Sequence, residues 1–185
     1  IGLRERHKTG TAGLMICAER AQIIDALLTH LFDYALRSYQ DTRGVPPAPV
    51  ALVALGGYGR GELSPWSDVD VMFLFPIKTK LAEAKPLQEH LTDQILYIRW
   101  DLGLKVGHST RSLDEMVRAA KEDLTICTAL LEARYVWGDQ ALSEEGAARF
   151  RFGFEVQRHA MADGRLQLAV ALARPREGDP ARVLP

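Results

Sequence analysis

Apolar residues recur at three- and four-residue intervals from Thr11 to about Gln40, and this spacing predicts a long amphipathic helix. The segment that follows, 41–49, contains three prolines and a glycine, so no regular element can cross it. We therefore expect a helix and a linker that pack on the rest of the chain. The apolar stripe of this helix comprises Leu14, Ala18, Ala21, Ile24, Leu28, Leu31 and Ala35.

Two short apolar runs follow the linker and predict two strands. Residues 50–55 are continuously apolar and rich in β-formers, which is typical of a strand buried on both faces. Residues 69–75 predict a second strand, which Pro76 ends. The segment between them, 56–68, is dense in glycine and turn-forming residues. We expect a glycine-rich loop that leads directly into the second strand.

The rest of the chain predicts helices and one further short strand. Together with the elements above, these signals indicate the α+β class, with a small mixed or antiparallel twisted sheet flanked by helices and helical additions at both ends. In chain order the signals are a helix over 79–101, a third strand over 102–109, a helix N-cap at Ser112, a helical stretch over 124–137 and a further helix from Ser143 to about Ala173.

These elements divide the chain into three parts. Residues 1–49 are the N-terminal helix and linker, residues 50–140 the core of the domain, and residues 141–185 a C-terminal helical segment. The chain does not open with Met, and its tail after Ala173 is polar and rich in breakers. We therefore expect a piece of a longer protein, in which the last segment continues.

Composition narrows the class of protein. With 185 residues, 47% hydrophobic and 25% charged, the chain is long enough for one domain with its own core. A formal net charge of -1 gives no basic excess of the kind that nucleic-acid coating proteins show. Charges interrupt every apolar stretch before it reaches the roughly 20 residues that a membrane span needs. Cys17 and Cys127 are far apart, which predicts free thiols in a reducing cytoplasm. We expect neither a nucleic-acid nor a membrane partner.

Asp68 and Asp70 are the first candidates for chemistry. Alternate residues of a strand project to the same face, so these carboxylates lie roughly 6.5–7 Å apart along the backbone. They repel one another unless a cation lies between them, and hard oxygen ligands with an open approach suit Mg²⁺ or Mn²⁺. Such a pair commonly serves phosphoryl or nucleotidyl transfer. We expect both residues to be metal ligands.

The glycine-rich loop supplies candidates for phosphate binding. Gly56 and Gly57 let backbone N–H groups approach an anion that any Cβ would hold away, and a helix that begins there would add its dipole. Arg60 can bond a triphosphate in bidentate fashion, with Glu62 fixing its orientation. Ser67 can bond phosphate or simply cap the turn.

Each of these features has an ordinary structural explanation when it stands alone. Asp-X-Asp is common on solvated edge strands, and glycine-rich turns occur everywhere. In this order and at this spacing the combination is far more specific. Two aspartates on one side of a very apolar strand also destabilise a fold that binds no cation, so the functional interpretation of Asp68 and Asp70 is favoured.

The same residues resemble a known family. The likeness covers roughly Thr11 to Asp139 and includes the short stretches 123–125 and 130–134. The chain is similar to the DNA polymerase β-type nucleotidyltransferases and, within them, to the protein-PII uridylyltransferases. The two longest stretches that carry the resemblance are Gly-Gly-Tyr-Gly-Arg-Gly-Glu-Leu-Ser-Pro-Trp-Ser-Asp-Val-Asp at 56–70 and Trp-Asp-Leu-Gly-Leu-Lys-Val-Gly-His-Ser-Thr-Arg at 100–111.

The resemblance implies a polymerase β-type fold and transfer of UMP from UTP to a tyrosine hydroxyl of the trimeric nitrogen-signalling protein PII. It implies Mg²⁺ at Asp68 and Asp70, with pyrophosphate as the leaving group. Complete members also carry a hydrolase domain that removes UMP and glutamine-sensing domains, so the residues here correspond to the transferase part. The superfamily usually has a third carboxylate on a neighbouring strand, for which Asp101 is the first candidate and Asp123 the next, although either can be a surface acid at a helix end.

Other side chains have weaker signals. Arg111 follows the third strand and can bring positive charge to a triphosphate, whereas His108 is at least as well explained as a structural histidine. Tyr58 and Trp66 can stack on a base, but aromatic residues beside glycine turns more often pack over the loop. The histidines without metal-ligand spacing, which we interpret as surface or structural residues, are His7, His30, His90 and His159.

Three alternatives to uridylyl transfer remain. The first is nucleotidyl transfer, such as adenylyl transfer, to another protein or to a small hydroxylated molecule. The second is a regulatory domain that binds nucleotide without turnover. The third is a plain interaction module, which the cost of two unpaired carboxylates disfavours.

Overall fold

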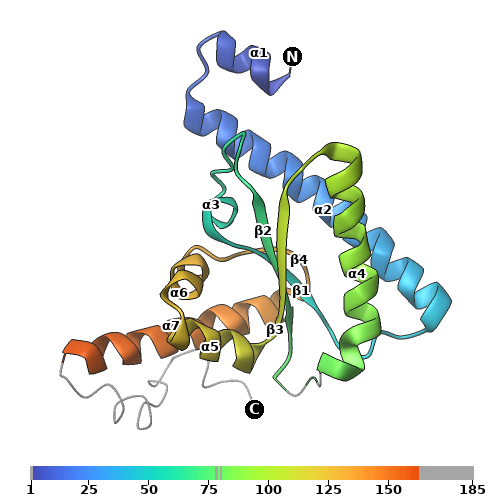
Figure 1. Ribbon diagram of the computed structural model, residues 1–185, viewed down its shortest axis with the longest axis vertical. Helices are drawn as coiled ribbons and strands as arrows, with labels where there is room; N and C mark the ends of the chain where they lie inside the picture. Colours follow the sequence, from blue (N-terminus) through green and yellow to red (C-terminus); the bar gives the residue numbers. More distant parts are fainter. Residues whose placement is uncertain (1, 78, 80, 163–185) are drawn as a thin grey trace.

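A computed structural model describes residues 2–77, 79 and 81–162. Within these ranges the chain forms one sheet and a series of helices (Figure 1). In chain order the elements are α1 (Leu3–Lys8), α2 (Gly13–Arg43), β1 (Ala51–Ala54), α3 (Gly56–Gly59), β2 (Val69–Phe75), α4 (Leu81–Leu102), β3 (Val106–Ser112), α5 (Leu113–Glu122), α6 (Leu124–Leu131), β4 (Arg134–Gly138) and α7 (Gln140–Ala162).

The four strands form one mixed sheet in the order β3-β2-β1-β4. β1 runs antiparallel to both β2 and β4, and β2 runs parallel to β3. The parallel pair is connected by α4, as a crossover between parallel strands requires. The expected α+β class with a small mixed sheet is confirmed, and so are the first two strands. All four residues of β1 are buried, as a strand in the middle of a covered sheet must be.

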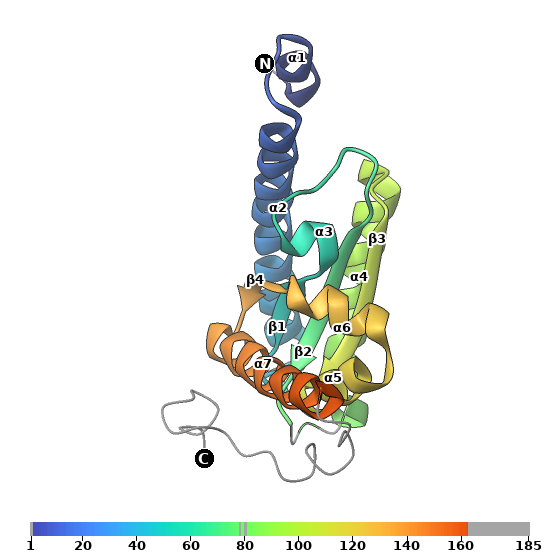
Figure 2. The ribbon, with the colours of Figure 1, turned by 90° about the vertical axis from the view of Figure 1, so that its left-hand side faces the viewer.

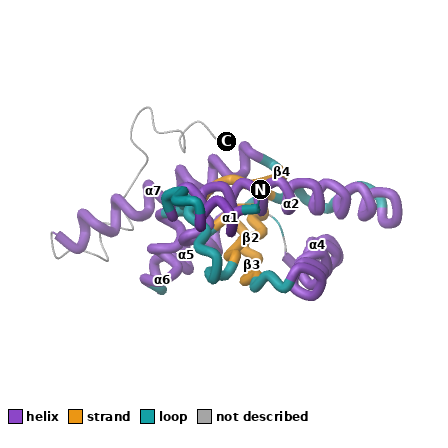
Figure 3. Tube along the Cα trace, turned by 90° about the horizontal axis from the view of Figure 1, so that it is seen from above, coloured by secondary structure: helices purple, strands orange, loops and turns teal. Residues whose placement is uncertain are grey.

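Helices cover both faces of the sheet (Figures 2 and 3). α2 and α4 pack on one face, where alternate β2 residues such as Val71 and Phe73 join their core. α5, α6 and α7 cover the other face, where Met72 and Leu74 point. Because side chains alternate along a strand, Asp70 lies on the same side as Met72. The side of the sheet that α5–α7 cover is therefore also the side of the Asp70 carboxylate.

The expected N-terminal helix is confirmed as α2, but its buried stripe differs from the expected one. Phe32 and Tyr39 belong to the buried face, whereas Leu14 is 68% exposed. Phe32 is fully buried, with its ring centroid 5.3 Å from that of Phe73 and 5.6 Å from that of Trp137. Burying such a side chain contributes roughly 1.5–3 kcal/mol, so α2 is an integral part of the core.

The predicted helix from 124 to 137 is wrong in its second half. α6 ends at Leu131, and residues 134–138 form β4, which pairs with β1 through a register shift between Leu52 and Val53. The local sequence of this apolar stretch is compatible with a helix or a strand. Pairing with the free edge of β1 makes residues 134–138 a strand. No helix within the described ranges has the length and apolar character that crossing a membrane would require.

Other boundaries also move. The third strand begins at Val106 rather than 102, because α4 continues to Leu102. The predicted N-cap at Ser112 is confirmed: its Oγ accepts from the N–H of Glu115, whose carboxylate accepts from the Ser112 N–H at 2.9 Å. The last helix is α7, and its predicted extension to Ala173 lies outside the described residues.

Candidate active site

Asp68 and Asp70 lie at the point where the glycine-rich loop enters β2. The Leu55 N–H donates to the carbonyl of Asp70 at 2.9 Å, and the Val69 N–H donates to the carbonyl of Lys105 at 2.8 Å. The backbone of this segment is therefore fixed between the end of β1 and the beginning of β3. Asp70 is the only exposed residue of β2, so its carboxylate reaches solvent although its neighbours are core residues.

The two carboxylates interact electrostatically. Burial raises the pKa of Asp70, and the negative charge of Asp68 raises it further. None of the ion pairs found in the described part of the chain involves either residue. The two carboxylates are hard oxygen ligands, disfavour each other's negative charge and remain open to solvent. They therefore fit a divalent cation such as Mg²⁺ or Mn²⁺.

The predicted glycine loop begins with a single helical turn, α3, directly after β1. Gly56 opens the turn with φ of 55°, a left-handed conformation that favours glycine. A Cβ on Gly59 would overlap the carbonyl oxygen of Glu132 and lie 3.0 Å from that of Ala54. α3 therefore packs against the end of α6, and its first N–H groups, which have no acceptor within the turn, lie beside the loop that leads to Asp68.

Arg60 is held in place by two glutamates. Its Nε donates to Glu62 Oε2 at 3.1 Å, and its Nη1 lies 2.5 Å from Glu132 Oε2. The two carboxylates raise the pKa of Arg60. The expected pairing with Glu62 is present, whereas Glu132 was not expected, because only the packing of α6 on α3 brings it near. The Nη2 of Arg60 lies next to Gly57, 3.6 Å from where a Cβ would stand.

A second network anchors α3 from behind. Arg134 on β4 donates to both carboxylate oxygens of Asp25 on α2, at 2.9 and 3.0 Å, and to the carbonyl of Gly59 at 3.2 Å. The Tyr58 hydroxyl donates to Asp25 at 2.6 Å, and burial followed by this bond raises the pKa of Tyr58. Tyr58 is 1% exposed, so it packs under the loop, as the structural interpretation expected.

The exposed part of the loop carries Ser67 and Trp66. The Ser67 N–H donates to the carbonyl of Ser64 at 3.0 Å, and Arg20 of α2 donates to the same carbonyl, which ties the loop to the helix. Trp66 is 94% exposed. The expectation that it packs over the loop is therefore wrong, because the Ser64–Ser67 turn directs its side chain away from the protein.

Arg111 and Asp123 lie together but further along the sheet. Arg111 is in register with Leu74, four residues from the Asp70 pair on the same strand, which corresponds to about 13 Å. Asp123 caps α6 by accepting from the N–H of Thr125 at 2.7 Å and of Ile126 at 3.3 Å. These bonds, and more weakly the charge of Arg111, lower the pKa of Asp123. Asp123 therefore acts as an acid at a helix end, which was the expected alternative to a role as third carboxylate.

The other candidates do not gather at the carboxylates either. Asp101 lies in the last turn of α4 rather than ahead of a strand, and its side chain is outside the described residues. His108 is exposed and is in register with Val71, so it points to the opposite side from Asp70. His30 and His90 bond to main-chain carbonyls of Ala26 and Ala35. Among the described side chains, no group of three His, Cys, Asp or Glu residues is placed to hold a metal ion.

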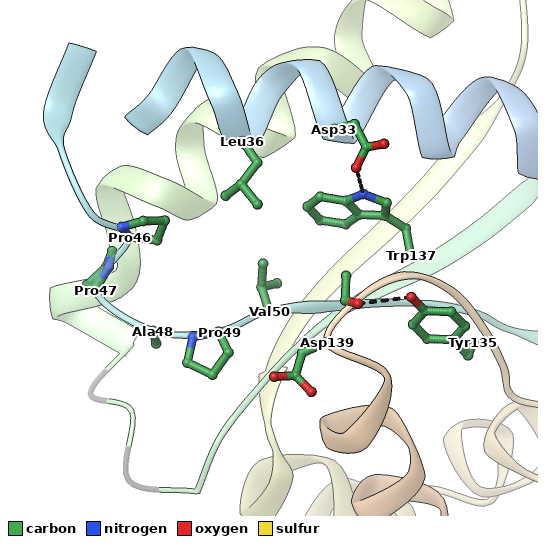
Figure 4. A pocket seen from close by; sticks show the side chains of 11 residues that line it. Asp33, Leu36, Pro46, Pro47, Ala48, Pro49, Val50, Tyr135, Trp137 and Asp139 are labelled. Atoms are coloured by element: carbon green, nitrogen blue, oxygen red, sulfur yellow. Dashed lines mark hydrogen bonds between the residues drawn. The ribbon is translucent and has the colours of Figure 1, made fainter. Parts of the chain in front are cut away.

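A large cavity lies at the other end of the sheet (Figure 4). It measures about 640 Å³ and is lined by the prolines of the linker, by Trp137 and by Asp33, whose carboxylate accepts from the indole N–H at 2.6 Å. Val50 and Gly138 line the cavity at the start of β1. Asp70 lies at the opposite end of that strand, where its carbonyl accepts from the N–H of Leu55. The cavity is therefore separate from the carboxylate pair.

Comparison with known proteins relates the chain to one family. Residues 42–133 match the nucleotidyltransferase domain family. The chain is similar to bifunctional uridylyltransferase/uridylyl-removing enzymes of three bacteria. These are the proteins of Novosphingobium aromaticivorans, with 48% identity over 150 residues, of Rhodospirillum rubrum, with 44% over 150, and of Erythrobacter litoralis, with 45% over 141.

The similarity includes most of this chain but a small part of each relative. The aligned residues make up 80%, 80% and 76% of the chain, in the same order, and 16%, 15% and 15% of the relatives' own length. The matched family segment begins in the last turn of α2 and ends before β4, so it contains α3, the loop and both aspartates. The chain therefore belongs to the nucleotidyltransferase family of transferase enzymes.

Proposed function

We propose that the chain transfers UMP from UTP to a tyrosine hydroxyl of a PII-type signalling protein. The observation that carries this proposal is the pair of solvent-accessible carboxylates, Asp68 and Asp70, directly beside the glycine-rich turn α3. The names of the three relatives support uridylyl transfer rather than another nucleotidyl transfer. The free thiols Cys17 and Cys127 agree with a cytoplasmic setting.

Asp68 and Asp70 are the proposed ligands of Mg²⁺ or Mn²⁺. Such a cation, when bound, supplies positive charge that offsets the charge of the phosphates. In the reaction, the acceptor hydroxyl oxygen forms a bond to the α-phosphorus of UTP, and the bond from that phosphorus to the bridging oxygen of the β-phosphate breaks. UMP becomes esterified to the acceptor, pyrophosphate leaves, and the hydroxyl proton passes to solvent.

The chain's own residues have defined tasks in this proposal. Gly56 and Gly57 present backbone N–H groups to the phosphates, because no Cβ keeps an anion away from them. Arg60, oriented by Glu62 and Glu132, and Ser67 bind phosphate oxygens. Arg111 is the more distant cation and contributes through long-range charge. The acceptor reaches the site from the solvent side of Asp70.

A second candidate function is a regulatory domain that binds nucleotide without turnover. It is favoured by one observation: among the described residues no third acidic side chain joins Asp68 and Asp70. Release of pyrophosphate distinguishes the two functions, since a binding domain produces none.

The test is an assay of pyrophosphate release with UTP or ATP, Mg²⁺ and PII as acceptor. We expect release with UTP that depends on the acceptor and falls at least about 100-fold in Asp68→Asn and in Asp70→Asn, because each substitution removes a charged ligand. Arg149→Ala on α7, which removes an ion pair with Glu145 and none of the proposed site residues, is the control and should retain full release. Tight UTP binding without any pyrophosphate would establish the regulatory alternative instead.

A further inference from the structure

A glycine lies directly beside Asp70 on the neighbouring strand. Parallel pairing of β2 with β3 places Gly107 in register with Asp70, so the two residues face the same side of the sheet. A Cβ built on Gly107 would overlap Oδ1 of Asp70. The Asp70 carboxylate therefore occupies the space that a side chain at position 107 would otherwise fill.

The backbone gives no other reason for glycine at this position. The φ angle of Gly107 is outside the left-handed region, in contrast to Gly56, Gly61 and Gly103. Glycine in the interior of a strand normally weakens it, because glycine loses more conformational freedom on folding and has no side chain to pack. The nearest atoms to the hypothetical Cβ are Oδ1 and Cγ of Asp70. Asp70 is thus the steric obstacle to a larger residue.

We propose that Gly107 is a positioning residue for the metal-binding carboxylates. Without a Cβ at 107, the Asp70 side chain can lie across the β3 backbone in its present rotamer, with Asp68 beside it. A Cβ would force the carboxylate into a different staggered rotamer, and a ligand displaced by about 1 Å no longer chelates well. Gly107 also explains why β3 supplies no acidic partner in register with Asp70.

This inference rests on the proposed metal site, and its test uses metal binding rather than turnover. Mn²⁺ is titrated into the chain without nucleotide, and free Mn²⁺ is followed by electron paramagnetic resonance for the wild type and for Gly107→Ala. We expect at least about tenfold weaker Mn²⁺ binding in the variant, with a melting temperature close to that of the wild type. The matched control is Gly153→Ala on α7, where a Cβ would meet Val117 at an ordinary 3.6 Å and should leave Mn²⁺ binding unchanged.

Two outcomes overturn the inference in different ways. If Mn²⁺ binding is lost in Asp70→Asn but is normal in Gly107→Ala, the positioning role is rejected and the metal site stands. If Mn²⁺ binding is the same in wild type, Asp68→Asn and Asp70→Asn, the metal site itself is rejected, and the role of Gly107 with it.

A further variant covers the case in which Gly107→Ala does not fold. Gly107→Ala is then combined with Asp70→Ala, which removes the carboxylate that meets the new Cβ. Recovery of the melting temperature in the double variant supports the steric coupling between the two positions. Equal loss of stability with and without the Asp70 carboxylate contradicts it.

Discussion

At the residue scale, Asp70 carries a charge that folding disfavours. Its carboxylate is partly buried and lies near that of Asp68, and both effects raise its pKa. A raised pKa means that the folded state prefers the protonated form, so ionisation of Asp70 opposes folding as the pH rises from the ordinary aspartate pKa through the raised one. Above the raised pKa this cost is fully present until a cation offsets it.

Asp70→Asn is therefore expected to raise the melting temperature of the metal-free protein at pH 7. Below about pH 3.9, where an ordinary aspartate is protonated, the difference should disappear. Mg²⁺ should raise the melting temperature of the wild type and not that of the variant, because a ligand stabilises only the state that binds it. Asp93→Asn, on the exposed side of α4, is the control, and thermal melts over a pH series are the measurement. A wild type more stable than Asp70→Asn without metal at pH 7 would contradict the account.

Gly57 is the second test at this scale. A Cβ there would lie 3.6 Å from both Arg60 Nη2 and the Glu62 carbonyl, which is ordinary contact, and φ is outside the left-handed region. Gly57→Ala should keep the free energy of unfolding within about 1 kcal/mol of the wild type but weaken UTP binding at least about tenfold, because the methyl group holds phosphate away from the backbone. Calorimetric titration and thermal melts report the two effects. If the affinity for UTP is unchanged, the phosphates do not bind at this turn.

At the scale of elements, one side chain connects three of them. Arg134 of β4 binds Asp25 of α2 and two carbonyls of α3. Arg134→Lys should cost about 1–3 kcal/mol, because lysine cannot reproduce the bidentate bond and leaves Asp25 poorly paired. Arg149→Lys, which weakens an i,i+4 pair on α7, should cost no more than about 0.5 kcal/mol. Urea unfolding measures both, and equal costs would show that the network does not anchor the loop.

The elements also show how far local sequence determines the fold. Periodicity predicted α2, two short apolar runs predicted β1 and β2, and Ser112 followed by acidic residues predicted the cap of α5, because each of these signals lies within a few residues. β4 was missed, since its residues become a strand only by pairing with β1. The spacing of Asp68 and Asp70 predicted that they share one side, whereas Gly107 and Glu132 join the site through sheet register and helix packing.

At the scale of the whole molecule, the folding unit is larger than the matched family segment. Residues 42–133 omit all of α2 before its last turn, yet Phe32 of α2 packs between Phe73 of β2 and Trp137 of β4. They also omit Arg134, which anchors α3. The division into parts at residues 49 and 140 therefore remains a proposal about the chain, while the packing favours one continuous body that contains α2.

We propose that Asp68 and Asp70 make nucleotide binding depend on a divalent cation. The most direct measurement is calorimetric titration of UTP and of ATP into the protein with and without Mg²⁺, repeated on the Asp68→Asn/Asp70→Asn double variant after its fold is verified by circular dichroism. We expect Mg²⁺-dependent binding, tighter for UTP than for ATP, that is weakened at least about 100-fold in the double variant. Equally tight, Mg²⁺-independent binding of UTP by the folded double variant would contradict it.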